Sequence, residues 1–209
     1  MAGETFDRDF WERRWAQALR EHSEQVAGRP PNPHLLAEIA GLDPGFALDA
    51  GCGHGAEAIW LAAAGWRVTA VDFSVTALEQ GRATARAVGA DVAERIEWVE
   101  GDLGSWTPSP GHFDLVSCLY VHMAGSVDEM VRRLAPGVAP GGTLFLVGHL
   151  PVDPATGEPT PAAGQVQVSV EAATEALDAH EWQVVVAEDR PRAAAGTGVD
   201  AVVRAVRRA

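Results

Sequence analysis

From residue 35 onward, short apolar runs alternate along the chain with segments in which apolar residues recur every three or four positions. Short apolar runs between turn residues predict buried strands, and the longer period predicts helices packed against them. Such alternation is typical of an α/β fold with a mostly parallel sheet and helices on both faces. We expect strands at residues 46–50, 67–71, 96–100, 113–119, 143–147, 183–187 and 199–206.

Capping residues and glycines set the predicted helix ends. We expect helices at residues 56–64, before Gly65; 75–88, from Ser74 to Gly89; 127–136, after a Ser126/Glu129 capping box; and 170–179, after Ser169. The segments 28–34 and 150–165 are predicted to be irregular, and 140–142 is predicted to be a turn. Residues 7–20 predict an amphipathic helix, in which Trp11 and Trp15 share a face with Leu19.

The chain has 209 residues, of which 47% are hydrophobic, so it is long enough to bury a full core in one domain. We expect residues 1–34 to form a helical cap segment and residues 35–209 to form the α/β domain. Two cysteines argue against a disulfide framework. The sequence has no apolar run of membrane-spanning length, so no membrane partner is expected. Residues 1–5 contain no apolar stretch of a signal peptide, so a cytoplasmic location is expected.

The net charge of −13 bears on the partners of the protein. All 16 basic residues are Arg, and only three isolated pairs of them are adjacent, so the basic stripe that nucleic-acid binders use to neutralise phosphates is missing. The sequence therefore predicts a small-molecule partner and no nucleic acid. It does not predict an oligomeric state.

The most informative motif is Leu48-Asp49-Ala50-Gly51-Cys52-Gly53-His54-Gly55, which links a predicted strand to a predicted helix. Glycines at this junction let the backbone approach a ligand closely. The spacing also satisfies the fingerprint of dinucleotide-binding proteins, in which a diphosphate lies at the helix N-terminus. The motif therefore indicates a nucleotide-type ligand but leaves its identity open.

Acidic residues stand at the ends of the first three predicted strands. Asp49 would repel a diphosphate but suits the ammonium group of a bound amino acid. Asp72 can accept hydrogen bonds from both ribose hydroxyls, in NAD as well as in other nucleosides. Asp102 offers an acceptor to an adenine amine. A ligand that joins an amino acid to adenosine accounts for all three.

Simpler explanations stand beside these. The glycine run could be only a turn, Asp102 only a loop residue, and Phe73, a candidate cover for adenine, only part of the core. Trp11 and Trp15 are equally compatible with core packing.

The runs 48–55 and 68–74, with Glu100-Gly101-Asp102, Phe113-Asp114-Leu115-Val116 and Pro140-Gly141-Gly142, resemble class I S-adenosylmethionine-dependent methyltransferases in order and spacing. The likeness covers about residues 35–150. It implies a Rossmann-like, doubly wound sheet of seven strands with the last strand antiparallel, and S-adenosylmethionine as methyl donor, released as S-adenosylhomocysteine.

The resemblance also implies donor-binding residues. Asp49 and the glycines Gly51, Gly53 and Gly55 would face the methionine part, Asp72 the ribose and Asp102 the adenine, with Phe73, Leu103 and Cys118 nearby. A looser likeness to the small thiopurine- and tellurite-type methyltransferases rests on residues 10–15 and 58–62. It implies that Trp11 and Trp15 cover the donor.

Methyl transfer from a sulfonium needs chiefly an in-line arrangement, which can contribute roughly 7–11 kcal/mol. A base is needed only when the acceptor must lose a proton. The candidates are His122, past the fourth strand, and His149, past the fifth, although each could be an ordinary loop histidine. Tyr120 and Cys118 are expected in the same region. No metal site is expected, because Asp114 lies at the start of its strand.

Two alternatives remain open at this stage. One is a short NAD(P)-dependent oxidoreductase, against which stand Asp49 and the absence of any Tyr-x-x-x-Lys pair in a chain without Lys. The other is a non-catalytic protein that binds S-adenosylmethionine. The loop 150–165 could be a lid over an acceptor or only a surface connection.

Overall fold

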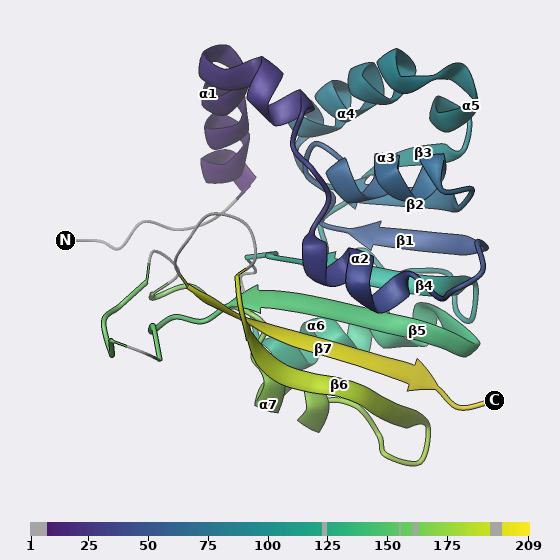
Figure 1. Cartoon of the computed structure of the whole chain (residues 1–209), viewed down its shortest axis with the longest axis vertical. Coiled ribbons are helices and arrows are strands. Elements are labelled where there is room, and N and C mark those ends of the chain that lie inside the picture. The colour runs from purple at the N-terminus through teal and green to yellow at the C-terminus, as the bar shows by residue number, and fades with distance from the viewer. Residues whose placement is uncertain (1–7, 123–124, 155, 161–162, 193–197) are drawn as a thin grey trace.

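A seven-stranded sheet forms the centre of the computed structural model, which describes residues 8–122, 125–154, 156–160, 163–192 and 198–209 (Figure 1). The strands lie in the order β3 (Ile96–Glu100), β2 (Arg67–Asp72), β1 (Phe46–Ala50), β4 (Phe113–Leu119), β5 (Val138–His149), β7 (Val199–Arg207) and β6 (Trp182–Pro191). Neighbours from β3 to β5 are parallel, whereas β7 is antiparallel to β5 and to β6. The expected doubly wound α/β fold is confirmed, including its antiparallel last strand.

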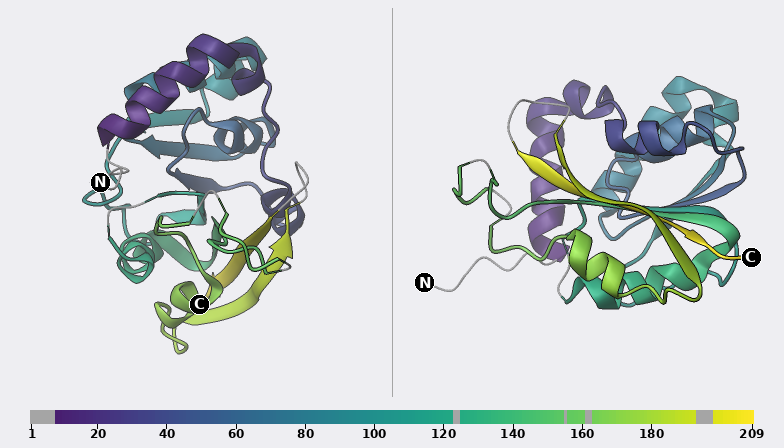
Figure 2. Two further views of the ribbon diagram at one scale, coloured as in Figure 1. Left: turned by 90° about the vertical axis from the view of Figure 1, so that its left-hand side faces the viewer. Right: turned by 60° about the horizontal axis from the view of Figure 1, so that its bottom comes forward.

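Helices cover both faces of this sheet (Figure 2). They are α1 (Arg8–Ala27), α2 (Pro33–Ile39), α3 (Ala56–Ala63), α4 (Val75–Val88), α5 (Ala90–Ala93), α6 (Val127–Leu134) and α7 (Val170–Glu175), with a 3₁₀ turn at Ala135–Gly137. Successive residues of a strand point to opposite faces. Ala47 accordingly belongs to the apolar cluster under α2, α3 and α4, and Leu48 to the cluster under α6 and α7.

The predicted helix starts are confirmed by side-chain caps. Ser74 Oγ accepts a hydrogen bond from Ala77 N at 3.1 Å. Ser126 and Glu129 form the expected capping box, and Ser169 Oγ accepts from Ala172 N at 3.2 Å. Each cap satisfies backbone N–H groups that the first helical turn leaves free.

The structure corrects several of the predicted boundaries. Helix α1 runs to Ala27 and β6 to Pro191, beyond the expected ends at residues 20 and 187. Residues 28–34 are not wholly irregular, because α2 begins at Pro33; proline is tolerated in a first turn, and Asn32 caps it. Pro140–Gly142 is not a turn before the strand but lies inside β5, which runs on to His149. Helix α7 ends at Glu175 instead of near residue 179. The loop 150–165 is present, although residues 155 and 161–162 lie outside the described ranges.

The topology brings several strand ends to one edge. In Figure 1 the arrowheads of β1 and β5 point toward the side where α1 lies, while β7 runs the opposite way. The ends of the parallel strands therefore meet the start of β7 at this edge. In open α/β sheets, ligands bind beside the carboxyl ends of the strands.

Among the described residues, no helix combines the length and apolar character needed to cross a bilayer. The division into a cap segment, 1–34, and a domain, 35–209, stays an expectation, and residues 1–7 lie outside the described ranges.

Gly148 tests how closely the segment before α7 packs on β5. A Cβ added at Gly148 would lie 2.4 Å from Val168 O and 2.7 Å from Val168 N, both backbone atoms. Because backbone cannot move aside like a flexible side chain, we expect Gly148→Ala to lower the free energy of unfolding by about 1–3 kcal/mol. At Gly41 the added Cβ would meet nothing within 4 Å. Urea unfolding should therefore show a far smaller effect for Gly41→Ala, and equal effects would contradict this packing.

Candidate functional site

The glycine loop between β1 and α3 has a backbone that only glycine adopts readily. Gly51 has a φ of +77° and Gly53 a φ of +53°. A Cβ at Gly51 would lie 2.2 Å from Val121 Cγ2, and one at Gly53 would lie 2.7 Å from Trp15 Cζ2. The N–H groups of Gly51 and Cys52 both donate to Val71 O, at 2.8 and 3.0 Å. The loop is thus tied to β2, and its glycines let the side chains of Val121 and Trp15 approach the backbone closely.

Asp49, at the end of β1, is buried and only partly hydrogen-bonded. Its side chain accepts a hydrogen bond from Ser117 Oγ at 3.3 Å, while Oδ2 is buried with no hydrogen-bond partner among the described residues. Burial, together with the nearby charge of Glu57, raises the pKa of Asp49 well above its usual range. A buried, half-satisfied carboxylate is costly unless a cation or a donor completes it.

Asp72, at the end of β2, holds the loops on either side of it. Its Oδ2 accepts from Gly53 N and its Oδ1 from Ser74 N, each at 2.8 Å. Burial raises its pKa, although these backbone hydrogen bonds oppose the rise. Each carboxylate oxygen can accept a further hydrogen bond. The next residue, Phe73, is half-buried.

Asp102 lies just beyond β3, on the neighbouring strand end. Its side chain is exposed, and Oδ1 accepts from Gly104 N at 2.8 Å. Leu103 beside it is buried and belongs to the apolar cluster under α6. Asp49, Asp72 and Asp102 therefore end three adjacent strands, as the sequence predicted.

Helix α1 lies against the glycine loop and α4. Trp15 contacts Gly53 and packs against the ring of His54, with ring centroids 5.3 Å apart. Glu12 Oε1 accepts from Thr76 N at 3.2 Å and also from the Thr76 hydroxyl. Trp11 Nε1, Glu12 Oε2 and His54 Nε2 are buried polar atoms with no partner in the described part of the chain. Like Asp49 Oδ2, they leave hydrogen-bonding capacity at the glycine loop for a polar ligand.

His122 lies past β4, under the same helix. Its ring stacks on Trp11 with centroids 4.7 Å apart. Burial, followed by the charges of His149 and Arg14, lowers its pKa to about 4. His122 is therefore uncharged at neutral pH.

His149, the last residue of β5, belongs to a cluster around Asp200. His149 Nδ1 lies 2.9 Å from Asp200 Oδ1, and its ring stacks on Tyr120 with centroids 4.1 Å apart. The Tyr120 hydroxyl donates to Asp200 Oδ2 at 2.8 Å and accepts from Asn32 Nδ2 at 2.8 Å. Arg192 donates to Asp200 through Nε and Nη2. Four segments of the chain thus meet at one buried carboxylate.

Cys118 faces the core on the side of α6. It is fully buried, and its Sγ lies 3.6 Å from Met130 Sδ. Burial raises the pKa of this thiol far above neutrality, so Cys118 is neither a base nor a nucleophile here.

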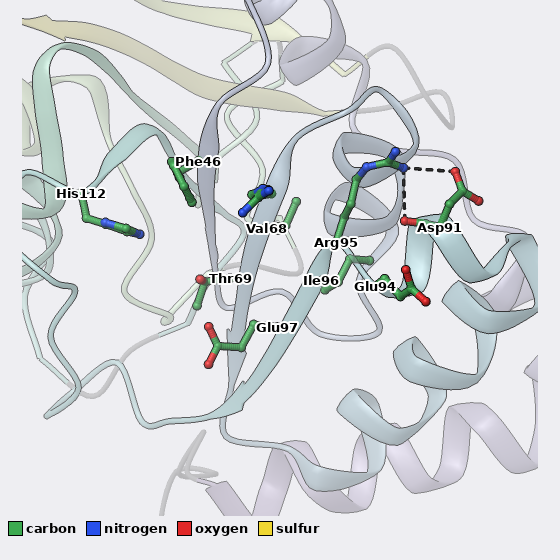
Figure 3. Close-up of a pocket in the computed structure, with 10 residues that line it drawn as sticks. Phe46, Val68, Thr69, Asp91, Glu94, Arg95, Ile96, Glu97 and His112 are labelled. Carbon is green, nitrogen blue, oxygen red and sulfur yellow. Dashed lines mark hydrogen bonds and ion pairs between the residues drawn. The ribbon is translucent and has the colours of Figure 1, made fainter.

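A hollow of about 560 Å³ lies at the opposite, amino-terminal edge of the sheet (Figure 3). Its rim carries both signs of charge, with Arg67 and Arg95 beside Asp91, Glu94 and Glu97. It lies away from the glycine loop and from the candidate bases His122 and His149. Asp114 is also near this edge and accepts from Phe46 N at 2.8 Å. Among the described residues, no three His, Cys, Asp or Glu side chains are grouped as a metal site.

The structure thus assembles two adjoining groups at the carboxyl edge. One surrounds the glycine loop, and the other joins Tyr120, His149 and Asp200. Sequence reasoning missed Asp200, Arg192 and Glu57. Asp200 is visible in the sequence as an acidic residue directly before the apolar run 201–203. Its hydrogen-bond partners, however, lie 8 to 80 residues away along the chain.

The acidic loop suits S-adenosylmethionine, the donor that the sequence predicts. That molecule carries an ammonium and a sulfonium charge, and Asp49, Glu57 and Asp72 present carboxyl groups around the glycine loop. The pKa of each is raised, because burial disfavours carboxylates that have no cationic partner. A cation fits this surrounding, whereas a diphosphate would be repelled.

Comparison with known proteins agrees. Residues 47–142 match the family model described as a methyltransferase domain. The chain is 31% identical over 138 residues to trans-aconitate 2-methyltransferase of Paracidovorax citrulli, an alignment that covers 63% of this chain and 49% of that protein. The chain thus spans about half the length of this curated relative.

Solved structures show the same fold. An S-adenosylmethionine-dependent methyltransferase from Mesorhizobium loti superposes with a TM-score of 0.67 at 21% identity, covering 87% of this chain and all of that one. The [4+2]-cyclase SpnF superposes with a TM-score of 0.69 at 18% identity, covering 94% and 96%. The narrower likeness to thiopurine- and tellurite-type enzymes stays a prediction. Residues 47–142 thus match a methyltransferase domain, and the fold is the one that solved S-adenosylmethionine-dependent methyltransferases share.

Proposed function

We propose that this protein transfers the methyl group of S-adenosylmethionine to a sulfur, oxygen or nitrogen atom of a small-molecule acceptor. One observation carries the proposal: the buried Oδ2 of Asp49, unpaired among the described residues, at the end of β1 beside the glycine loop. An ammonium group there would complete the carboxylate and offset its desolvation.

The other donor contacts follow from the strand order. In this proposal Gly51, Gly53 and Gly55 approach the methionine part, and Asp72 receives the ribose hydroxyls. Asp102 receives the adenine amine, with Phe73 and Leu103 along the ring and the buried Cys118 in the wall behind. Trp11 and Trp15 of α1 then cover the donor, because Trp15 already lies on Gly53.

When bound, S-adenosylmethionine supplies an electrophilic methyl carbon on a sulfonium. The protein's own contribution is to hold the acceptor in line with that carbon and to exclude water, and neither task needs a nucleophilic side chain. If the acceptor is protonated, His122 or His149 is the group that takes the proton.

Two observations support a small-molecule acceptor: the net charge of the chain and the name of a related protein. The chain carries a net charge of −13, which disfavours phosphate polymers. The relative named above acts, by its name, on trans-aconitate, a small molecule.

Two other functions compete with this one. A nicotinamide-dependent oxidoreductase would require a diphosphate beside Asp49 and Glu57. A protein that binds the donor without transferring methyl is the stronger competitor, because the related fold of a [4+2]-cyclase shows that fold alone does not fix the reaction.

Calorimetric titration with S-adenosylmethionine, S-adenosylhomocysteine and NADH tests the donor site. We expect the two adenosyl compounds to bind and NADH not to bind. Asp49→Asn keeps the shape but removes the charge that faces the ammonium, so affinity should fall by about 10- to 100-fold.

The matched control is Glu97→Gln, an exposed acid at the opposite edge of the sheet, which should leave both affinities unchanged. Binding of NADH alone would contradict the donor assignment. Binding of the adenosyl compounds that Asp49→Asn does not weaken would contradict the role of Asp49. Tritium transfer from labelled donor to a panel of thiols, phenols, amines and carboxylic acids then separates an enzyme from a binding protein.

The same substitution should act in the opposite direction on stability. The folded-state pKa of Asp49 is raised above its unfolded value of about 3.9, so the ligand-free protein loses stability as pH rises from about 4 through the folded-state pKa. Asp49→Asn lacks this loss. At pH 8 its melting temperature should exceed that of the wild type by about 2–4 °C, equivalent to about 1 kcal/mol, and the difference should shrink at pH 5. A variant that is less stable at pH 8 would show that the carboxylate is satisfied.

A further inference from the structure

Asp200 is the most heavily hydrogen-bonded carboxylate among the described residues. Its side chain is fully buried at the start of β7. Oδ1 accepts from Arg192 Nη2 at 3.0 Å and from Arg192 Nε at 3.2 Å, and Oδ2 accepts from the Tyr120 hydroxyl at 2.8 Å. His34 Nε2 lies 3.6 Å from Oδ2. Burial raises the pKa of Asp200, but the hydrogen bonds from His149, Arg192 and Tyr120 outweigh it and bring the pKa to about 2.

The ring of His149 is fixed between this carboxylate and Tyr120. The two rings stack at 4.1 Å with an interplanar angle of 23°. Tyr120 itself has a φ of +54°, a left-handed conformation that bulky residues rarely adopt. Such strain persists where the surroundings impose it, often at functional sites. Here the Tyr120 hydroxyl accepts from Asn32 and donates to Asp200, and these two hydrogen bonds hold the strained residue in place.

Two contacts of Nδ1, one with an acceptor and one with a donor, bear on which nitrogen of His149 carries the proton. Nδ1 lies 2.9 Å from Asp200 Oδ1 and 2.8 Å from Arg192 Nη2. Without a proton on Nδ1, its lone pair would face an ionised carboxylate. With a proton there, His149 donates to Asp200, and Arg192 still has Asp200 as acceptor for both of its nitrogens. The protonated Nδ1 leaves a lone pair on Nε2, the nitrogen farther from Asp200, on a side chain that is 26% exposed.

We propose that His149 is the general base of the methyl transfer, that Asp200 is its positioning residue, and that the acceptor atom is a hydroxyl oxygen. This inference rests on the proposed function. A thiol or carboxylate acceptor that is already ionised would need no such pair, whereas an alcohol or a phenol must lose a proton as it is methylated.

The step balances as follows. The hydroxyl proton passes to Nε2 of His149 while the oxygen forms a bond to the methyl carbon. The electron pair of the breaking carbon–sulfur bond stays on sulfur, which leaves neutral S-adenosylhomocysteine. Asp200 stabilises the resulting imidazolium, which returns its proton to water. In this arrangement the carboxylate sets the tautomer and orientation of the ring.

His122 is the weaker candidate for this role. It stacks under Trp11, its pKa is lowered to about 4, and no carboxylate pairs with it in the described part of the chain. The charged and titratable groups that lie near His149 are Asp200 from β7, Arg192 after β6, Tyr120 after β4 and His122.

The tautomer can be measured without an acceptor, by long-range ¹H–¹⁵N spectra of the full chain labelled at histidine. His149→Gln assigns the signals. We expect neutral His149 to carry its proton on Nδ1. Asp200→Asn should move the ring toward the Nε2-protonated form, because the amide no longer presents an ionised acceptor to Nδ1. A neutral ring protonated on Nε2, or one that Asp200→Asn leaves unchanged, would overturn the pairing.

A second variant covers the case in which Asp200→Asn fails to fold. Arg192→Gln removes the only charged donor, among the described residues, that competes for Nδ1. The proposal predicts that the Nδ1 proton stays in this variant. A switch of tautomer would mean that Nδ1 accepts from Arg192 and that His149 is structural.

Activity then tests the acceptor class with phenols of graded acidity, 4-nitrophenol to 4-methoxyphenol, and with thiophenol as the ionised comparison. His149→Gln and Asp200→Asn should lower kcat by about 100-fold or more on the least acidic phenol and by less on 4-nitrophenol. The dissociation constant of S-adenosylmethionine should change less than twofold, and His180→Gln, an exposed histidine, should change neither quantity.

The outcomes separate this inference from the proposed function. A wild-type protein that does not bind S-adenosylmethionine removes the proposed function itself. A protein that binds the donor but methylates thiophenol and no phenol, or no member of the series, overturns the hydroxyl assignment and leaves the donor site standing. Transfer to phenols that His149→Gln reduces by less than threefold overturns the role of His149.

Discussion

The burial of carboxylates at one edge of the sheet is the constraint on which the rest of the structure depends. A carboxylate removed from water must be completed by cations or hydrogen-bond donors, or its charged form becomes unfavourable. Asp49 and Asp200 meet this constraint in opposite ways. Asp200 is surrounded by donors and its pKa is held low, whereas Asp49 keeps one oxygen unpaired among the described residues and its pKa is raised. Asp200 is therefore a fixed support, and Asp49 is the carboxylate that can still receive a cationic ligand.

The topology explains why both lie at the same edge. Parallel strands β1, β2 and β3 end there, which brings Asp49, Asp72 and Asp102 side by side. Because β7 is antiparallel to β5, its start lies opposite the end of β5, and His149 pairs in register with Asp200. An all-parallel sheet would have placed the start of its last strand at the far edge. The antiparallel strand thus places Asp200 directly beside His149.

Most of the fold was predictable from the sequence because its signals are local. Strands β3 and β4 were predicted with their observed bounds, and so were the serine caps before α4, α6 and α7. For α6 the signal was a pair three positions apart, Ser126 and Glu129. The errors occurred where tertiary packing overrides a local signal. Pro33 looked like a break but begins a helix capped by Asn32, and Pro140–Gly142 looked like a turn but pairs within the sheet. The glycine loop and its acids were likewise visible, since they follow directly on apolar strands.

The second half of the site was not predictable in the same way. Tyr120 and His149 were named as candidates, but their partners Asn32, Asp200 and Arg192 are brought to them only by the fold. No periodicity links Asn32 to Tyr120 across 88 residues. The left-handed backbone of Tyr120 is also invisible in the sequence, because the residues that hydrogen-bond its hydroxyl lie 88 and 80 positions away. Local patterns therefore indicated the candidate donor site, and long-range hydrogen bonds indicated the candidate acceptor site.

A crystal structure of the protein with S-adenosylhomocysteine tests the central claim most directly. The account predicts that the amino group of the ligand lies within hydrogen-bonding distance of Asp49 Oδ2, with its ribose on Asp72 and its adenine beside Asp102. A ligand bound at the opposite edge, in the hollow between Arg67 and Glu94, or a ligand at the glycine loop whose amino group leaves Asp49 unpaired, would contradict it.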